Sequence, residues 1–188
     1  MTEQLREQLR ELYEVLRADT RERWDRDLPL EELLFDRWER AQSLGFGEGS
    51  SIYHNSYVYG DVSVGRNTWI GPFTMLDGTG GLSIGDGCSI SSGVQIYSHD
   101  TVHWAVSAGA SIPERSPVAI GDFTYLGSQT VVGRGVTIGE HSVIGACSFV
   151  NRDIPAYTVA VGVPCRPIGT VKIGEDGAVE LQYPAARP

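Results

Sequence analysis

Two of the four histidines of this chain, His99 and His103, lie four residues apart in one segment, YSHDTVHW. An unperturbed imidazole titrates at about pH 6.5, so it can accept a proton at neutral pH, and the neutral ring can also bind a metal ion. A zinc site needs three or four ligands at defined spacings. The residue types in this segment therefore suit proton transfer, with a metal site as the alternative.

The segment interrupts a repeat of six residues. Aliphatic residues occupy every sixth position before and after it, with one slip of two residues after Leu76. Neither a helix nor a single long strand has this period, so short strands separated by turns are predicted. Three such strands make one triangular coil, and the fourteen repeats predict a parallel β-helix of four to five coils. The repeats are marked by Ile52, Val58, Val64, Ile70, Leu76, Ile84, Ile90, Ile96, Ile120, Leu126, Val132, Ile138, Ile144 and Val150.

Two further columns accompany the aliphatic one. The residue after the aliphatic position is glycine in eight repeats, for example Gly127 and Gly139, and we expect a turn with unusual φ there. The residue four positions after the aliphatic one is small or β-branched, as at Ser56, Thr74 and Thr130, which suits a tight corner.

The break in this regular repeat is the predicted functional site, because long loops on rigid scaffolds often carry binding and catalytic residues.

The repeat divides the chain into three parts. Leucines at three- and four-residue steps predict an amphipathic helix over about residues 2–18, and a second helix is expected over 30–43. After the repeats, two short strands flanking Gly-Glu-Asp-Gly predict a hairpin, followed by a disordered Pro-rich end. The predicted organisation is a helical segment, a β-helix domain with a protruding loop, and a hairpin with a tail: 1–49, 50–169 with the loop at about 97–117, and 170–188.

Composition restricts the function classes. A net charge of -9 and a pI near 4.8 argue against nucleic-acid binding, which usually requires a basic surface. No apolar run approaches the ~20 residues that a membrane span requires. Three cysteines cannot all pair within the chain, and the N-terminus offers no apolar leader, so we expect a reduced, cytoplasmic protein.

The segment YSHDTVHW resembles the histidine loop of the hexapeptide-repeat O- and N-acetyltransferases, a family that includes galactoside, maltose and nucleotide-sugar acetyltransferases. The later stretch VNRDIPAYTVAVGVPCRPI resembles the closing signature of the same family. With the repeats, the resemblance covers roughly residues 50–172. It implies a left-handed β-helix that forms trimers and moves an acetyl group from acetyl-coenzyme A (acetyl-CoA) to a hydroxyl or amine of a small acceptor, with a sugar or nucleotide-sugar as the expected substrate.

By this resemblance His99 is the general base that removes the acceptor proton as the acceptor attacks the thioester. Such catalysis contributes about 10²- to 10⁴-fold in rate. His103 is the competing candidate for this role. Asp100 could orient the imidazole of His99, although adjacent side chains in an extended strand point to opposite sides.

The resemblance also implies a groove for the cofactor between neighbouring subunits. Arg152 and Arg166 would supply the local positive charge for the 3′-phosphate that the acidic chain otherwise lacks. Two positions depart from the family pattern: Tyr125 replaces the usual tryptophan, and Gly169 stands where a second arginine is common. The implied cofactor-binding residues are Tyr125, Ser128, Ala146, Asn151, Arg152 and Arg166.

Two other functions fit the same solenoid. The gamma-class carbonic anhydrases bind zinc with three histidines across a trimer interface, but His54 and His141 lie far in sequence from the histidine segment, so no metal is expected. A non-catalytic scaffold would keep the solenoid without the chemistry. The intact histidine loop and closing signature favour the enzyme.

Overall fold

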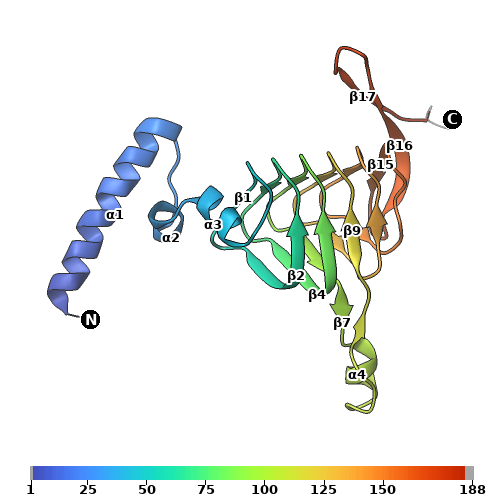
Figure 1. Ribbon diagram of the computed structural model, residues 1–188, viewed down its shortest axis with the longest axis horizontal. Helices are drawn as coiled ribbons and strands as arrows, with labels where there is room; N and C mark the ends of the chain where they lie inside the picture. The colour runs from blue at the N-terminus through green and yellow to red at the C-terminus, as the bar shows by residue number, and fades with distance from the viewer. Residues whose placement is uncertain (1, 185–188) are drawn as a thin grey trace.

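The computed structural model describes residues 2–184 and confirms a mainly β fold built on hexapeptide repeats. Figure 1 shows short strands stacked side by side into a wedge-shaped solenoid, with a helical segment at its N-terminal end and a hairpin at the other. All strand pairs within the solenoid are parallel, and each strand pairs with the strand of the next coil.

The solenoid has three faces. The first sheet forms face A. The second sheet folds over a corner, because two long strands run across it, and its two sides are faces B and C. Face A contains β1 (Ser51–Ile52), β3 (Trp69–Ile70), β5 (Ser89–Ile90), β10 (Tyr125–Leu126), β13 (Val143–Ile144) and β15 (Thr158–Val161). Face B contains β6 (Gln95–Tyr97), β11 (Val131–Val132) and β14 (Phe149–Val150); face C contains β9 (Val118–Ile120) and β12 (Thr137–Ile138); and β2 (Tyr57–Val64) and β4 (Met75–Ile84) cross from B to C.

The aliphatic column fills the interior. Of the predicted positions, all are buried except Val58, which is partly buried and packs on the same cluster. Face A contains six parallel strands, so the solenoid completes five coils and begins a sixth, slightly more than predicted. The extra length comes from Ile154 and Ala160, which are buried in line with the column. Ile154 follows Val150 by four residues, so a search with a period of six residues does not find it.

The prediction of unusual φ at the glycine column is wrong. Positive φ falls two positions further on, at residues such as Asn67, Phe123 and Gln129. At seven of the eight positions, all but Gly133, an added Cβ would meet atoms closer than 3.0 Å: a Cβ on Gly127 would lie 2.5 Å from the backbone nitrogen of Ala146 in the next coil. Space rather than backbone conformation therefore selects glycine here.

The first helix, α1 (Glu3–Trp24), is longer than its leucine spacing indicates, and none of its residues is buried. The side chain of Thr2 accepts a hydrogen bond from the backbone of Leu5 at its start, and Asp25 ends it with φ 51°. The last turns are stabilised by charge: Arg17 forms an ion pair of 2.7 Å with Asp27 in the following segment. The leucines mark only the apolar part of the helix.

The second predicted helix is divided into α2 (Leu30–Leu34) and α3 (Arg37–Ser43). Phe35 is extended between them, and the carboxylate of Asp36 accepts hydrogen bonds from the first backbone N–H groups of α3. A new N-cap at Asp36 therefore restarts the helix in a different direction.

At the C-terminal end, β16 (Arg166–Ile173) pairs antiparallel with β15 and with β17 (Val179–Gln182), which forms the predicted hairpin. The first part of β16 lies along β15 of the last coil, and the hairpin with β17 projects beyond the solenoid (Figure 1). The predicted disordered end reaches residues 185–188, which lie outside the described residues. No helix of residues 2–184 is long and apolar enough to span a membrane.

Candidate active site

The predicted loop leaves the solenoid at the corner between faces B and C, here called the loop corner. It starts with β7 (His99–Asp100), continues through α4 (Val102–Val106) and returns through β8 (Glu114–Arg115), which pairs antiparallel with β7. Figure 1 shows it projecting away from the coils. Its base is joined to the solenoid, since the backbone of Ser116 donates to Ser98 at 2.9 Å and the hydroxyl of Ser98 accepts from the backbone of Gly80 at 2.7 Å.

His99 is held by a buried carboxylate from the preceding coil. Its Nδ1 forms a short hydrogen bond with Oδ2 of Asp77, whose side chain is 1% exposed, whereas that of His99 is 33% exposed. The other carboxylate oxygen of Asp77 accepts from the backbone and the hydroxyl of Thr79, at 3.0 and 2.5 Å. The backbone N–H of Ser98 also points to Oδ2, at 3.2 Å. Asp77 is thus fixed from both sides.

The charge of Asp77 determines which nitrogen of His99 is basic. Burial raises the pKa of the Asp77 carboxyl, but the hydrogen bonds from Thr79 and His99 lower it more, and the net pKa lies below the ordinary value. An ionised carboxylate can only accept a hydrogen bond, so Nδ1 of the neutral His99 must carry the proton. Nε2 then has a free lone pair and can accept a proton, which is the arrangement that a general base requires.

His99 opens into a cavity of about 640 Å³ at the loop corner, here called the His99 cavity. Aromatic and aliphatic side chains, among them Tyr97, Val131 and Phe149, form much of its wall. Besides His99, the polar residues that line it include Asn151 and the paired Asp100 and Arg134. Cavities with an apolar wall and few polar groups are typical of sites for small molecules.

The structure corrects the hypothesis that Asp100 orients His99. The carboxylate of Asp100 does not pair with His99 but accepts a hydrogen bond of 2.5 Å from Arg134, at the edge of the same cavity. The side-chain hydrogen bond from Arg134 lowers the pKa of Asp100. His103, the competing base, lies on α4 and is paired with Glu114 at 3.2 Å, outside the lining of the His99 cavity.

Sequence reasoning missed Asp77, although the sequence contained a signal for it. Asp77 follows Leu76 directly, in the column where eight other repeats have glycine. A buried carboxylate in a column that faces the next coil needs hydrogen-bond partners. The backbone N–H of Ser98 and the ring of His99, both from the next coil, are two of its partners.

The implied cofactor residues do not all gather around His99 within one chain. Asn151 lines the His99 cavity, and Arg152 follows it at the loop corner. Ser128 and Ala146 lie in successive turns at the corner between faces A and B, here called the A/B corner, while Tyr125 is exposed on face A. Arg166 starts β16, above the last coil. Their roles in cofactor binding stay a prediction.

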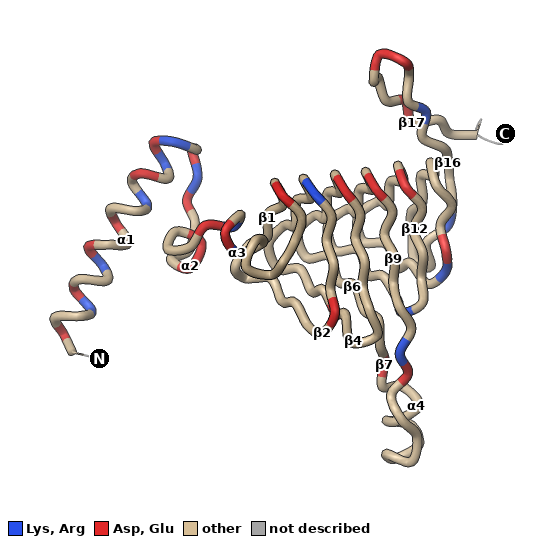
Figure 2. Tube along the Cα trace, in the orientation of Figure 1, with Lys and Arg blue, Asp and Glu red and all other residues tan. Residues whose placement is uncertain are grey.

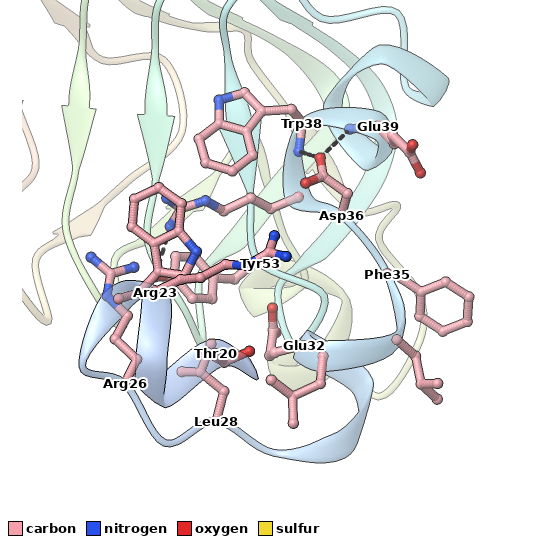
Figure 3. A pocket seen from close by; sticks show the side chains of 14 residues that line it. Thr20, Arg23, Arg26, Leu28, Glu32, Phe35, Asp36, Trp38, Glu39 and Tyr53 are labelled. Carbon is pink, nitrogen blue, oxygen red and sulfur yellow. Dashed lines mark hydrogen bonds between the residues drawn. The ribbon is translucent and has the colours of Figure 1, made fainter. Parts of the chain in front are cut away.

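A second cavity, of about 540 Å³, lies between the N-terminal helices and the first coil and is drawn in Figure 3. Trp38 and Tyr53 face it, and Arg37 lies over the Trp38 ring at 4.2 Å from its centroid while donating to the Tyr53 hydroxyl at 2.9 Å. None of the residues that line it is histidine or cysteine. Of the two cavities, the His99 cavity is the one lined by a histidine with a buried carboxylate partner.

No group of three or more His, Cys, Asp or Glu side chains within residues 2–184 is placed to hold a metal ion. The histidines are dispersed. His54 packs against Phe35, with 5.1 Å between the ring centroids, and His141 stacks between Phe123 and Tyr157 at 4.9 Å from each.

Comparison with known proteins gives consistent matches. The family described as bacterial transferase hexapeptide (six repeats) matches residues 117–152. The galactoside O-acetyltransferase of Escherichia coli (strain K12) is 36% identical over 141 residues, which cover 69% of this chain and 68% of that protein. A hexapeptide-repeat acetyltransferase of Vibrio cholerae, solved with acetyl-CoA, aligns at a TM-score of 0.61 and 26% identity over 88% of each chain. A maltose O-acetyltransferase from Clostridium difficile 630 aligns at 0.55 and 27% identity, over 89% of this chain and 86% of that one.

The chain belongs to the hexapeptide-repeat acyltransferase family. The fold, the repeats and the galactoside O-acetyltransferase match agree on this assignment. It defines the class of enzyme, an acyl-CoA-dependent O- or N-acyltransferase, and confirms the class predicted from the sequence.

Proposed function

We propose that this enzyme transfers an acetyl group from acetyl-CoA to a hydroxyl or amine of a small sugar-like acceptor, with His99 as the general base. The observation that carries the proposal is the Asp77–His99 pair, in which a buried, ionised carboxylate leaves Nε2 of the imidazole free beside a cavity of about 640 Å³. The relatives named for galactoside and maltose acetylation support a sugar as the acceptor.

The chemistry requires one base and no covalent enzyme intermediate. Nε2 of His99 accepts the proton of the acceptor hydroxyl or amine as that atom attacks the thioester carbonyl carbon. The carbon–sulfur bond then breaks, and the imidazolium of His99 returns the proton to the departing thiolate. Asp77 stabilises the transient positive charge on the ring and keeps it oriented.

The charges of this chain suit the donor substrate. Among the described residues, neither Arg152 nor Arg166 is within ion-pair distance of a carboxylate, so both guanidinium groups are available to a phosphate. Arg166 donates only to the backbone carbonyl of Cys165, at 2.6 Å. Arginines without a carboxylate partner give this acidic chain a local positive charge that can bind the phosphate groups of the cofactor.

A trimer would join the two halves of the site. Ser128 and Ala146 lie at the A/B corner, whereas His99 and Asn151 lie at the loop corner, so a neighbour that brings its A/B corner to this loop would complete one site. The loop tip suits such a contact: residues 101–113 contain no Lys, Arg, Asp or Glu, and Figure 2 shows the region around α4 without charge. Trp104 and Ile112 there are 50% and 84% exposed.

The test is an assay of CoA release from acetyl-CoA with a panel of simple glycosides, amino sugars and nucleotide-sugars. We expect His99→Ala to bind acetyl-CoA normally and to lose about 10²-fold or more in turnover. His141→Ala is the matched control, because His141 lies at the corner between faces C and A, here called the C/A corner. Full activity of His99→Ala would remove it from the mechanism, and absence of acetyl-CoA binding by calorimetry would favour a scaffold.

Sedimentation of the purified protein tests the trimer separately. The cytoplasmic location stays a prediction.

A further inference from the structure

We infer that Arg134 is a positioning residue for the general base, because it holds both strands at the base of the loop that carries His99. The inference rests on the proposed role of His99. Arg134 lies in the turn between β11 and β12, at the loop corner of the coil that follows the loop. The next residue, Gly135, donates its backbone N–H to Ser116 at 3.3 Å, so this turn sits directly against the returning end of the loop.

The guanidinium of Arg134 bridges the two strands. Its Nε donates to Oδ2 of Asp100 on β7 at 2.5 Å, and its Nη2 donates to Glu114 on β8. One side chain from a fixed corner of the solenoid thus contacts the outgoing and the returning strand of the loop. Arg134 is only 33% exposed, and both carboxylates are about one-third exposed, so the bridge is partly shielded from solvent.

Without Arg134 these strands would repel each other. Asp100 and Glu114 are direct cross-strand partners, and the β7–β8 ladder is only two residues long on each strand. Like charges placed directly opposite each other destabilise a strand pair. His103 contacts Glu114 at 3.2 Å, but its ring is 61% exposed and belongs to the loop itself, so it does not tie the two strands to the solenoid. Arg134 therefore converts a repulsive pair into a three-way ionic bridge.

The bridge acts on the base through the backbone of β7. His99 and Asp100 are adjacent in β7 and have different partners, Asp77 for His99 and Arg134 for Asp100. Arg134 itself lines the His99 cavity, and its contact with Asp100 fixes the strand directly beside the base. Loss of Arg134 leaves the hydrogen bonds of Ser98 and the Asp77–His99 contact in place, but it removes the contact that fixes the next residue of the strand, so the imidazole is held less firmly.

The test compares Arg134→Gln with Arg66→Gln. Arg66 forms an ion pair of the same kind, 2.8 Å from Asp86, but at the C/A corner, where Figure 2 shows charged residues in a row along the coils. We expect Arg134→Gln to lower kcat by about 10- to 100-fold, the range for a slightly misplaced catalytic group, with the KM for acetyl-CoA unchanged. Arg66→Gln should leave kcat unchanged. Adding Glu114→Gln to Arg134→Gln removes the repulsion and should restore part of kcat.

A second readout does not require turnover. A proton between Nδ1 of His99 and the Asp77 carboxylate gives a far-downfield proton NMR signal, which Arg134→Gln should broaden or abolish and Arg66→Gln should preserve. The inference fails if Arg134→Gln keeps both the signal and kcat, or if it raises the KM with kcat unchanged, which would make Arg134 a ligand-binding residue. If His99→Ala keeps full activity, the proposed base is wrong, while the NMR signal still reports whether Arg134 orders the loop.

Discussion

Replacing Asp77 by asparagine changes one buried oxygen into an amide nitrogen and leaves the shape of the side chain almost unaltered. Oδ1 accepts two hydrogen bonds from Thr79, so the amide oxygen must occupy that position. The amide NH₂ then takes the place of Oδ2, where it faces Nδ1 of His99 and the backbone N–H of Ser98. An NH₂ group donates to Nδ1, so the neutral ring is forced to carry its own proton on Nε2.

That tautomer has no lone pair on the nitrogen that faces the acceptor. Asp77→Asn should therefore remove most of the general-base contribution of His99, which is worth about 10²- to 10⁴-fold, or about 2.7 to 5.4 kcal/mol of transition-state stabilisation. The fall should be in kcat, measured as CoA release at saturating acetyl-CoA. The KM for acetyl-CoA should stay within about twofold, since a residue that acts only in the transition state does not change uniform binding.

A control variant and a double variant test whether the loss in kcat comes from the tautomer of His99. Asp122→Asn is the matched control: Asp122 also accepts a backbone hydrogen bond, 2.8 Å from the nitrogen of Asp86, but it lies at the C/A corner and should keep full turnover. The double variant Asp77→Asn with His99→Ala should be no slower than His99→Ala alone, because residues that act as a unit are not additive. Near-normal kcat in Asp77→Asn, or additive losses in the double variant, would refute the tautomer argument.

Three further outcomes follow from the same structure. Arg166→Ala should raise the KM for acetyl-CoA by about 10- to 100-fold and that for its 3′-dephosphorylated analogue much less; equal effects on both would contradict the phosphate contact. Gly139→Ala should lower the free energy of unfolding by about 1 to 3 kcal/mol in urea titrations, because its Cβ would lie 2.3 Å from the backbone nitrogen of Ala156, whereas Gly133→Ala, with its nearest atom at 3.6 Å, should be nearly neutral. Because the pKa of Asp77 is lowered in the folded chain, its ionised form adds stability above the unfolded value of about 3.9, and the difference in unfolding free energy between wild type and Asp77→Asn should shrink as the pH falls below that value.

The fold could be predicted from the sequence because every coil repeats the same physical requirement. An aliphatic residue every six positions fills the interior, and the regular column from Ile120 to Val150 leaves little freedom in register. The end of the solenoid was harder to predict, because Ile154 is buried out of step with the period. The splitting of the second helix was missed because a single cap at Asp36 outweighs the amphipathic pattern around it.

His99 is proposed as the general base from the resemblance of the histidine loop, and its residue type and its place at the break in a strict repeat agree with that proposal. Its partner could not be identified by proximity in sequence. Asp100 is the neighbour along the chain, but strand geometry turns it away, and Asp77 lies 22 residues earlier, one coil below. In a solenoid the residues that meet come from neighbouring coils: Asp77 pairs in register with Tyr97, and its side chain reaches His99 two residues further on. The search for partners therefore has to step by coils and not along the chain.

The same geometry explains why the predicted cofactor-binding residues do not line one pocket within a single chain. Ser128 and Ala146 come from turns between faces A and B, and Asn151 comes from the next turn of the chain, between faces B and C. A sequence motif records the order of these residues but not which corner of a triangular coil each one occupies. Rigid coils keep the two corners on opposite edges of face B, so one chain does not bring these residues together around His99. The arrangement of the predicted residues within one chain is thus an argument for a site shared between subunits.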